Sequence, residues 1–198
     1  MTGIVTALLV LTHTYAQAPA IKNPELREEL LKRVAADQAV RNEWIKQDVR
    51  KLDEAVLKRM EQIDADNSAR IKAIVTRFGW PGPALVGKDG TEAAFLLVQH
   101  ADHETQKAIL PIVTKAFRSG ELSGQNYALL VDRVLVRDGR PQVYGTQAKA
   151  FNQWKGEEPV FEPIEDEANL DARRRDVGLP PMAEYRRLLK QMYFPKKR

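Results

Sequence analysis

Apolar residues recur at steps of three and four along the first part of the chain, and this spacing restricts the fold more than any other feature. They form one stripe from Leu26 to Ile63, which predicts a long helix over about residues 23–63. Residues 23–25, Asn-Pro-Glu, are typical of a helix start, because Asn caps free amides, Pro suits the first helical position and Glu suits the positive end. The pattern therefore favours a mainly α-helical fold.

The middle of the chain continues this pattern. We predict a second helix over residues 66–78, ended by Gly79, and then a loop over residues 80–90 in which Trp80 folds back on the core. Asp89 and Glu92 resemble a capping box, so a central helix is expected to start there and to run to about Arg118.

The last third of the chain mixes helical and β signals. We predict a helix over residues 123–133 and a β-hairpin over residues 134–144, because β-rich arms flank the Asp-Gly pair at 138–139. Residues 169–192 predict two short helices separated by Gly178 and Pro180. Taken together, the sequence predicts a mainly α class: a single helical domain over residues 19–198 with one small antiparallel β-hairpin.

The first 18 residues resemble a secretory signal peptide. An apolar run from Ile4 to Leu11 is followed by small residues, with the expected cleavage after Ala16. A membrane-spanning helix needs about 20 apolar residues, so this run is too short to be one. We therefore interpret residues 1–18 as a signal peptide, and expect the mature chain to be periplasmic or secreted with no transmembrane segment.

Composition excludes several classes of function. The chain has no cysteine, which rules out thiol nucleophiles and cysteine-based zinc sites. Its formal net charge is +4, but acidic and basic residues alternate as they do on solvated helix faces, and no nucleic-acid-binding motif is present. The sequence therefore predicts no nucleic-acid partner and no cofactor.

Residues 93–106, AAFLLVQHADHETQ, place polar groups in an apolar helix face. At about 100° per residue, Gln99, Asp102 and Gln106 fall in the same arc as Phe95. An inward-facing carboxylate needs a partner, because an unpaired buried charge is costly. We therefore expect a buried polar network beneath residues 144–147, whose members are Asp37, Arg41, Asp102, Asp132 and Arg133.

His100 is the candidate catalytic residue, as a general base. Asp102 cannot orient it directly, because residues two apart on a helix do not face each other. Tyr144, Gln147 or Asp132 could supply the partner, and a purely structural histidine is the alternative. His103 is close enough to His100 to share a metal, but no HExxH motif accompanies the pair, so no metal site is predicted.

The ordered motifs DQxxR (37–41), GWP (79–81), QHAD (99–102), DR (132–133), YGTQ (144–147) and RRxxxGLPPxxEY (173–185) together resemble a family of bacterial proteins catalogued as a domain of unknown function. The resemblance covers nearly the whole expected mature chain and supplies no reaction. It implies a set of shared polar positions: Asp37, Gln38, Arg41, Gln99, His100, Asp102, Asp132, Arg133, Tyr144 and Gln147.

Two classes of function fit these observations. In the first, a polar pocket around QHAD and YGTQ binds an unknown small molecule or protein, with His100 as the catalytic candidate. Its ligand-binding candidates are Gln38, Arg41, Gln99, Asp102, Asp132, Arg133, Tyr144 and Gln147. In the second, the domain is a non-catalytic interaction or structural unit whose polar network only fixes helix packing. The sequence leaves open whether the protein is an enzyme.

Overall fold

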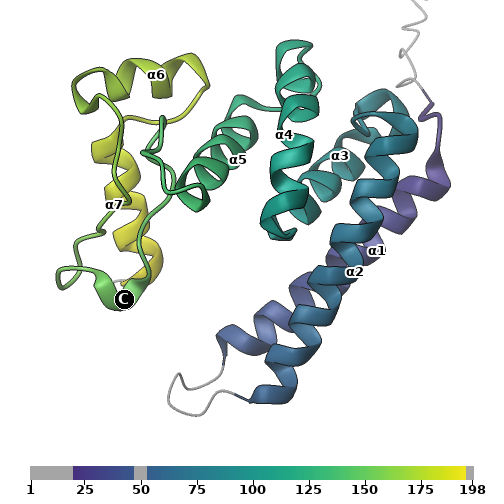
Figure 1. The fold of residues 1–198 in the computed structure, drawn as a ribbon, viewed down its shortest axis with the longest axis horizontal. Coiled ribbons are helices and arrows are strands. Elements are labelled where there is room, and N and C mark those ends of the chain that lie inside the picture. Colours follow the sequence, from purple (N-terminus) through teal and green to yellow (C-terminus); the bar gives the residue numbers. More distant parts are fainter. Residues whose placement is uncertain (1–19, 47–52, 195–198) are drawn as a thin grey trace, which may run out of the picture.

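The structure is a computed structural model that describes residues 20–46 and 53–194, and within them it is built from helices (Figure 1). The expected leader lies outside the described residues. The α-helices are α1 (Pro24–Ile45), α2 (Glu54–Phe78), α3 (Pro83–His100), α4 (His103–Arg118), α5 (Gly124–Arg137), α6 (Leu170–Asp176) and α7 (Met182–Tyr193), with short 3-10 turns at Phe151–Gln153 and Glu167–Asn169.

Helices α1 and α2 run side by side in opposite directions (Figure 1). The predicted start of α1 is confirmed, since the Asn23 side chain accepts a hydrogen bond from the Leu26 amide at 3.0 Å. The single long helix predicted over residues 23–63 is wrong. Asp53 caps α2 at its N-terminus, and the predicted helix over 66–78 is the C-terminal half of α2.

The predicted central helix is also two elements. Helix α3 already begins within the predicted loop, at Pro83, and is interrupted at Gly87, whose φ of 74° is left-handed. It ends at His100, and α4 starts at His103. Ala101 and Asp102 between them have extended backbone, so the helix-angle argument for this segment holds only up to His100.

The predicted β-hairpin over residues 134–144 is wrong. Helix α5 continues to Arg137, because Leu130 and Val134 are both buried one turn apart. Gly139, with a φ of 73°, then follows the helix end as a left-handed residue, so the Asp-Gly pair ends a helix and does not turn a hairpin. In the described residues β-pairing is limited to isolated bridges, such as Gln142 with Ile164.

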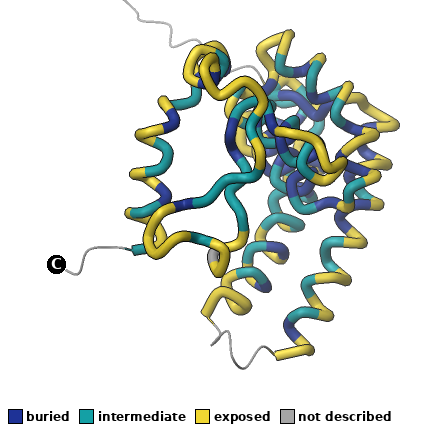
Figure 2. Tube along the Cα trace, turned by 60° about the vertical axis from the view of Figure 1, so that its left-hand side comes forward, coloured by how far each residue is buried: buried dark blue, intermediate teal, exposed yellow. Residues whose placement is uncertain are grey.

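The core lies where α1 to α5 pack together, and its members are among the residues coloured dark blue in Figure 2. Leu30, Ile74, Leu97 and Val113 are completely buried there. Trp80 packs into the same core with an exposed fraction of 8%, as the sequence predicted. Among the described residues, every helix is too short or too polar to cross a lipid bilayer.

The C-terminal segment joins this body through the fully buried Arg174 on α6. Its guanidinium donates hydrogen bonds to the carbonyl oxygens of Pro180, at 2.7 Å, and Tyr144, at 2.6 Å. The two predicted short helices are confirmed as α6 and α7, and Gly178 between them has a left-handed φ of 73°.

Candidate functional site

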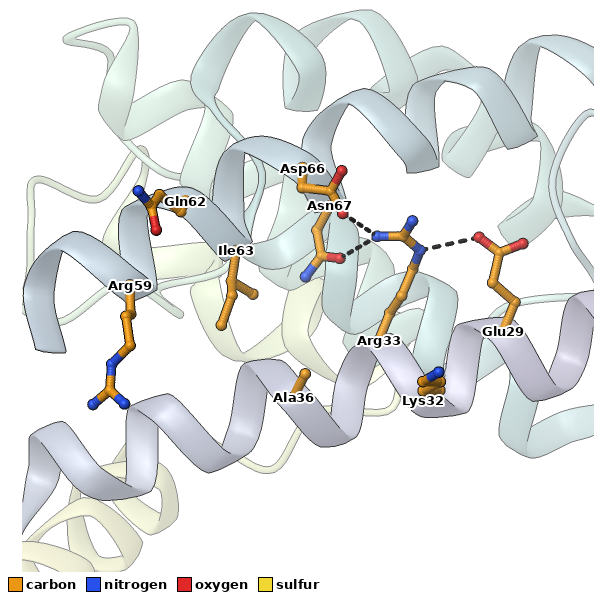
Figure 3. A pocket seen from close by; sticks show the side chains of 9 residues that line it. All are labelled: Glu29, Lys32, Arg33, Ala36, Arg59, Gln62, Ile63, Asp66 and Asn67. Atoms are coloured by element: carbon orange, nitrogen blue, oxygen red, sulfur yellow. Dashed lines mark hydrogen bonds and ion pairs between the residues drawn. The ribbon is translucent and has the colours of Figure 1, made fainter.

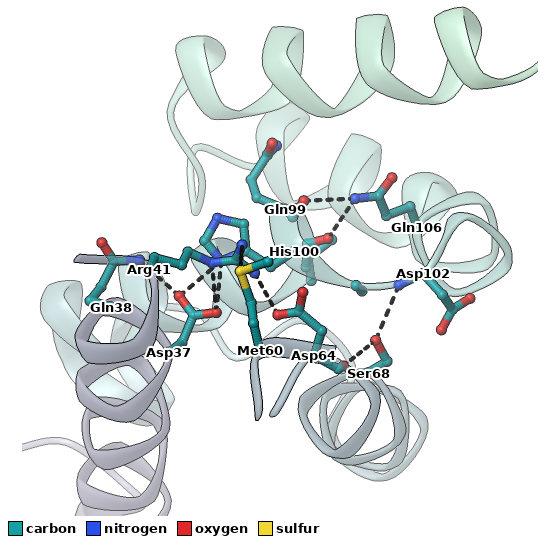
Figure 4. A network of polar contacts seen from close by, with 12 residues as sticks. Asp37, Gln38, Arg41, Met60, Asp64, Ser68, Gln99, His100, Asp102 and Gln106 are labelled. Atoms are coloured by element: carbon teal, nitrogen blue, oxygen red, sulfur yellow. Dashed lines mark hydrogen bonds and ion pairs between the residues drawn. The ribbon is translucent and has the colours of Figure 1, made fainter. Parts of the chain in front are cut away.

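Asp37 and His100 form a close pair between α1 and α3 (Figure 4). The Asp37 carboxylate is completely buried, and its two oxygens lie 3.0 and 2.9 Å from Nδ1 of His100. Burial disfavours the charged form of Asp37, but the hydrogen bonds from His100 and Gln38 and the charge of Arg41 outweigh it, so the pKa of Asp37 lies below its usual range. An ionised carboxylate only accepts hydrogen bonds, so Nδ1 of His100 carries a proton.

Arg41 packs against this pair. Its Nε donates to Oδ1 of Asp37 at 3.1 Å, and its Nη2 pairs with Asp64 on α2. Nε of Arg41 also lies 3.0 Å from Nδ1 of His100, but both atoms are then donors, so we read Asp37 as their shared acceptor. Burial raises the pKa of Asp64 despite the neighbouring Arg41. The cluster therefore places two carboxylates, one guanidinium and one imidazole at the junction of three helices.

Asp102 does not join this cluster. It is exposed and caps α4, since its carboxylate accepts from the Thr105 amide at 2.8 Å and from the Thr105 hydroxyl at 2.7 Å. The Thr105 amide, with further hydrogen bonds, holds the pKa of Asp102 below its usual range. The expectation that Asp102 points inward and pairs with an arginine is therefore wrong.

The amides of Gln99, near the C-terminal end of α3, and Gln106, near the start of α4, are both buried, as expected. Gln106 Nε2 donates to the carbonyl oxygens of Val98, at 3.0 Å, and Gln99, at 2.9 Å. Arg133 Nη1 also donates to the Gln99 carbonyl, at 2.9 Å, and Arg137 Nη1 donates to Oε1 of Gln106. Side chains from α4 and α5 thus satisfy carbonyl groups that the end of a helix leaves free.

Asp132 is completely buried and serves a different segment. Its carboxylate accepts from the backbone amides of Val143, Tyr144 and Thr146 and from the Thr146 hydroxyl, at closest distances of 2.8 to 2.9 Å. The predicted site residues Asp132 and Arg133 are therefore adjacent in sequence but face different neighbours. Asp132 fixes the chain that follows α5.

Tyr144 also supports this chain segment. Its ring meets the ring of Tyr127 edge to face, with centroids 6.2 Å apart. Burial, with a smaller contribution from Tyr127 and Asp132, raises the pKa of Tyr144 to about 12. Tyr144 is therefore a packed, neutral phenol. It is not among the residues that line the cavity described next.

That cavity, which we call the Arg133 cavity, has a volume of about 410 Å³. Among the predicted site residues, Arg133 and Gln147 line it. Its walls come from α5, from residues 146–154 and from α7: Leu129, Arg133, Thr146, Gln147, Ala148, Lys149, Ala150, Trp154, Tyr185, Leu189 and Tyr193.

Arg133 has an unusual electrostatic environment. Burial lowers the pKa of its guanidinium, and the charges of Arg137 and Arg41 lower it further. No carboxylate forms an ion pair with Arg133 in the part of the chain that the structure describes, and its Nε is buried without a hydrogen-bond partner there. Arg133 donates to the backbone carbonyl of Gln99, and the side-chain amide nitrogen of Gln99 is likewise buried and unpartnered among the described residues.

A second cavity of about 520 Å³ lies between α1 and α2 (Figure 3). Here Arg33 donates to Glu29 and Asn67 at 3.0 Å and to Asp66 at 2.6 Å. The charge of Arg33 is therefore compensated by the protein, whereas that of Arg133 is not. This contrast makes the Arg133 cavity the stronger candidate for ligand binding.

Sequence reasoning missed Asp64, Arg137 and Lys149. The antiparallel arrangement of α1 and α2 explains the pairs Arg33 with Asp66 and Glu29 with Arg70, which share one midpoint in the sequence. The pair Arg41 with Asp64 does not share that midpoint, so the same rule does not find Asp64. Nothing in the local sequence marks Lys149 as a cavity residue.

Comparisons with known proteins identify the family to which the chain belongs. Neither the curated proteins nor the solved structures contain a significant match to this chain. The model of one protein family, described as a family of unknown function (DUF6624), matches residues 24–198. This match spans every helix described above, and the chain therefore belongs to the DUF6624 family.

Proposed function

We propose that the chain is a small-molecule-binding domain that holds an anionic ligand in the Arg133 cavity. The observation that carries the proposal is the uncompensated guanidinium of Arg133 in the cavity wall. A buried charge without a counter-ion is costly, and a bound carboxylate, phosphate or sulfate would supply that counter-ion through charge-assisted hydrogen bonds.

Gln99 supports the same ligand chemistry. Gln99 has an exposed fraction of only 6%, and its side-chain amide nitrogen has no acceptor among the described residues. In Figure 4 this side chain points away from Asp37 and Arg41. Gln99 is not among the residues that line the Arg133 cavity, but its unpartnered donor Nε2, like Nε of Arg133, favours a ligand that offers acceptor oxygens.

The test is anion binding by isothermal titration calorimetry and by thermal stabilisation, with succinate, citrate, phosphate and sulfate as probes. We expect at least one anion to raise the melting temperature of the wild-type chain and to have no effect on Arg133→Gln. Arg140→Gln is the matched control, because Arg140 is exposed and the substitution removes the same charge. Equal stabilisation of wild type and Arg133→Gln would contradict the proposal.

The alternative, a non-catalytic structural or interaction domain, is favoured by Asp132, whose carboxylate is fully occupied by backbone and hydroxyl donors. The two readings differ in what Arg133 does for the free protein. If Arg133 is structural, Arg133→Met lowers the free energy of unfolding by several kcal/mol; if it awaits a ligand, the loss is at most about 1 kcal/mol, the value of one hydrogen bond.

Export is a further part of the proposal and rests on the sequence of residues 1–18 alone. We expect a bacterial host to deliver the protein to the periplasm without its leader. Intact-mass measurement of the periplasmic fraction should give a chain that begins at Gln17. Protein that keeps Met1 and stays in the cytoplasm would contradict export.

A further inference from the structure

His100 shows the arrangement of an oriented imidazole base. Nδ1 faces the buried carboxylate of Asp37, and the exposed fraction of the His100 side chain is 19%. Because the proton sits on Nδ1, the neutral ring has its lone pair on Nε2. That atom has no hydrogen-bond partner among the described residues, and it does not appear among the buried, unsatisfied atoms. It is therefore open to a solvent molecule or a ligand.

His103 has the reverse arrangement and provides an internal comparison. Its Nε2 lies 2.8 Å from Oδ1 of Asp138, whereas its Nδ1 is buried without a partner. The unpartnered nitrogen of His103 is thus buried, whereas the unpartnered nitrogen of His100 is accessible. Only His100 of these two can accept a proton from a molecule that arrives from solvent.

The Asp37–His100 pair is linked to Arg133 through the C-terminal end of α3. Arg133 lines the cavity and also donates to the carbonyl of Gln99, the residue before His100. Arg41, which lies against His100, is close enough to Arg133 for the two positive charges to repel each other. His100 itself is not among the residues that line this cavity, so a ligand whose anionic group lies on Arg133 must extend past Gln99 to reach the imidazole.

We propose that His100 is a general base that activates water for the hydrolysis of an ester bearing an anionic group, with Arg133 holding that group and Asp37 positioning the imidazole. This proposal rests on the proposed function, because Arg133 must bind the anion. It goes further by assigning a reaction and a catalytic residue.

The step balances without any further reagent. His100 Nε2 takes a proton from water as the water oxygen bonds to the ester carbonyl carbon. The tetrahedral intermediate then breaks its bond to the alcohol oxygen, and the imidazolium returns the proton to that oxygen. One ester and one water become one carboxylic acid and one alcohol, while the Asp37 carboxylate stabilises the transient imidazolium.

Water is the nucleophile that this arrangement favours. The chain has no cysteine, and no serine or threonine hydroxyl is hydrogen-bonded to His100 in the described residues. The nearby hydroxyl of Ser68 is already engaged, since it donates to the Asp64 carbonyl at 2.7 Å and accepts from the Asp102 amide.

The test uses two para-nitrophenyl esters on the full chain: the mono-ester of adipic acid, which is an anion, and the hexanoate, which has the same number of acyl carbons without the charge. We expect the wild type to hydrolyse the anionic ester in preference to the neutral one. His100→Asn should lower kcat for the anionic ester by about 100-fold or more. His103→Asn is the matched control and should retain wild-type rates.

Asp37 is a positioning residue in this scheme, so Asp37→Asn should lower kcat and leave KM unchanged. A direct readout needs no variant: nitrogen NMR of the histidine rings in the wild type should show the His100 proton on Nδ1. A proton on Nε2 at neutral pH, or equal hydrolysis by wild type and His100→Asn, would overturn the proposal even if Asp37→Asn fails to fold.

The two proposals fail in different ways. If His100→Asn abolishes hydrolysis but Arg133→Gln leaves KM for the anionic ester unchanged, the base stands and the anion site at Arg133 does not. If anions bind at Arg133 but His100→Asn hydrolyses both esters at the wild-type rate, the binding site stands and the hydrolytic role of His100 does not.

Discussion

At the scale of residues, three aspartates show how hydrogen-bond donors decide what a carboxylate does. Asp37 faces an imidazole and a guanidinium, Asp102 faces the first turn of its own helix, and Asp132 faces three backbone amides and a hydroxyl. The sequence marks all three as polar positions in helical segments, but the donors come from other elements. Their roles therefore become visible only in the folded chain.

Asp132 should be the most important of the three for stability. Asp132→Asn replaces one acceptor oxygen with a donor nitrogen that faces backbone N–H groups, and burial prevents water from compensating. We expect the free energy of unfolding to fall by roughly 3 kcal/mol in urea titrations. Asp138→Asn, at an exposed acid paired with His103, should cost much less. Equal losses would contradict the role assigned to Asp132.

At the scale of elements, arginine–acid pairs tie α1 to α2. Arg70 on α2 forms two hydrogen bonds of 2.6 Å with the Glu29 carboxylate, and Arg33 adds a third at 3.0 Å. The hydrogen bonds from Arg70 are the largest influence on Glu29, and together with Arg33 they lower its pKa to about 2. The folded state of this helix pair therefore favours ionised Glu29.

This pairing makes the stability of the helix pair depend on pH. Because the folded pKa is depressed, the stabilisation is present above the usual value of 4.5 and is lost as the pH falls towards 2. After allowing for solvent screening, we expect about 1 to 2 kcal/mol. Glu29→Gln should remove this part of the pH dependence in urea titrations. Glu28→Gln, at the exposed neighbouring position, should leave it intact.

The starts of α1 and α5 were predictable because they depend on a few adjacent residues, whereas the starts of α2, α3 and α4 were missed. Asn23 and Ser123 act as caps where the sequence places them, and Trp80 is buried as expected. Helix ends were less predictable. The Asp-Gly pair at 138–139 can turn a hairpin or end a helix, and the burial of Val134 on α5 decides for the helix.

The sequence named the candidate residues of the site, but it did not predict which of them contact one another. His100 does take its partner from another element, but that partner is Asp37 and not Tyr144, Gln147 or Asp132. The pairing spans 63 positions in the sequence and depends on how α1 packs against α3, which periodicity alone does not specify. Arg133 and Gln147 line one cavity, but His100 and Tyr144, which were predicted for the same pocket, do not line it.

At the scale of the whole molecule, the C-terminal segment meets the helical core at a close backbone contact. A Cβ atom added to Gly124, the first residue of α5, would lie 2.4 Å from the carbonyl oxygen of Val177. That distance is far below van der Waals contact, so either α5 or the end of α6 would have to move. Gly124 therefore permits the contact between these two parts of the chain.

Gly124→Ala should loosen the C-terminal segment, although alanine is the better helix former by about 1 kcal/mol. We expect a lower melting temperature and faster amide hydrogen exchange in α6 and α7. Gly139→Ala is the comparison: nothing lies within 4 Å of its added Cβ, so it reports only the cost of the left-handed φ. Unchanged exchange in α6 and α7 of Gly124→Ala would contradict this view.

The cluster of the buried Asp37 with the partly buried Arg41 and Asp64 also implies a trade-off between stability and the proposed chemistry. Desolvating three charges costs free energy that well-packed apolar side chains would not require, so Asp37→Leu, Arg41→Met and Asp64→Leu combined should give a protein at least as stable as the wild type in urea titrations. A strongly destabilised triple variant would contradict this expectation. Apolar side chains at this three-helix junction would serve stability alone, whereas the polar cluster found there is what the chemistry proposed for His100 requires.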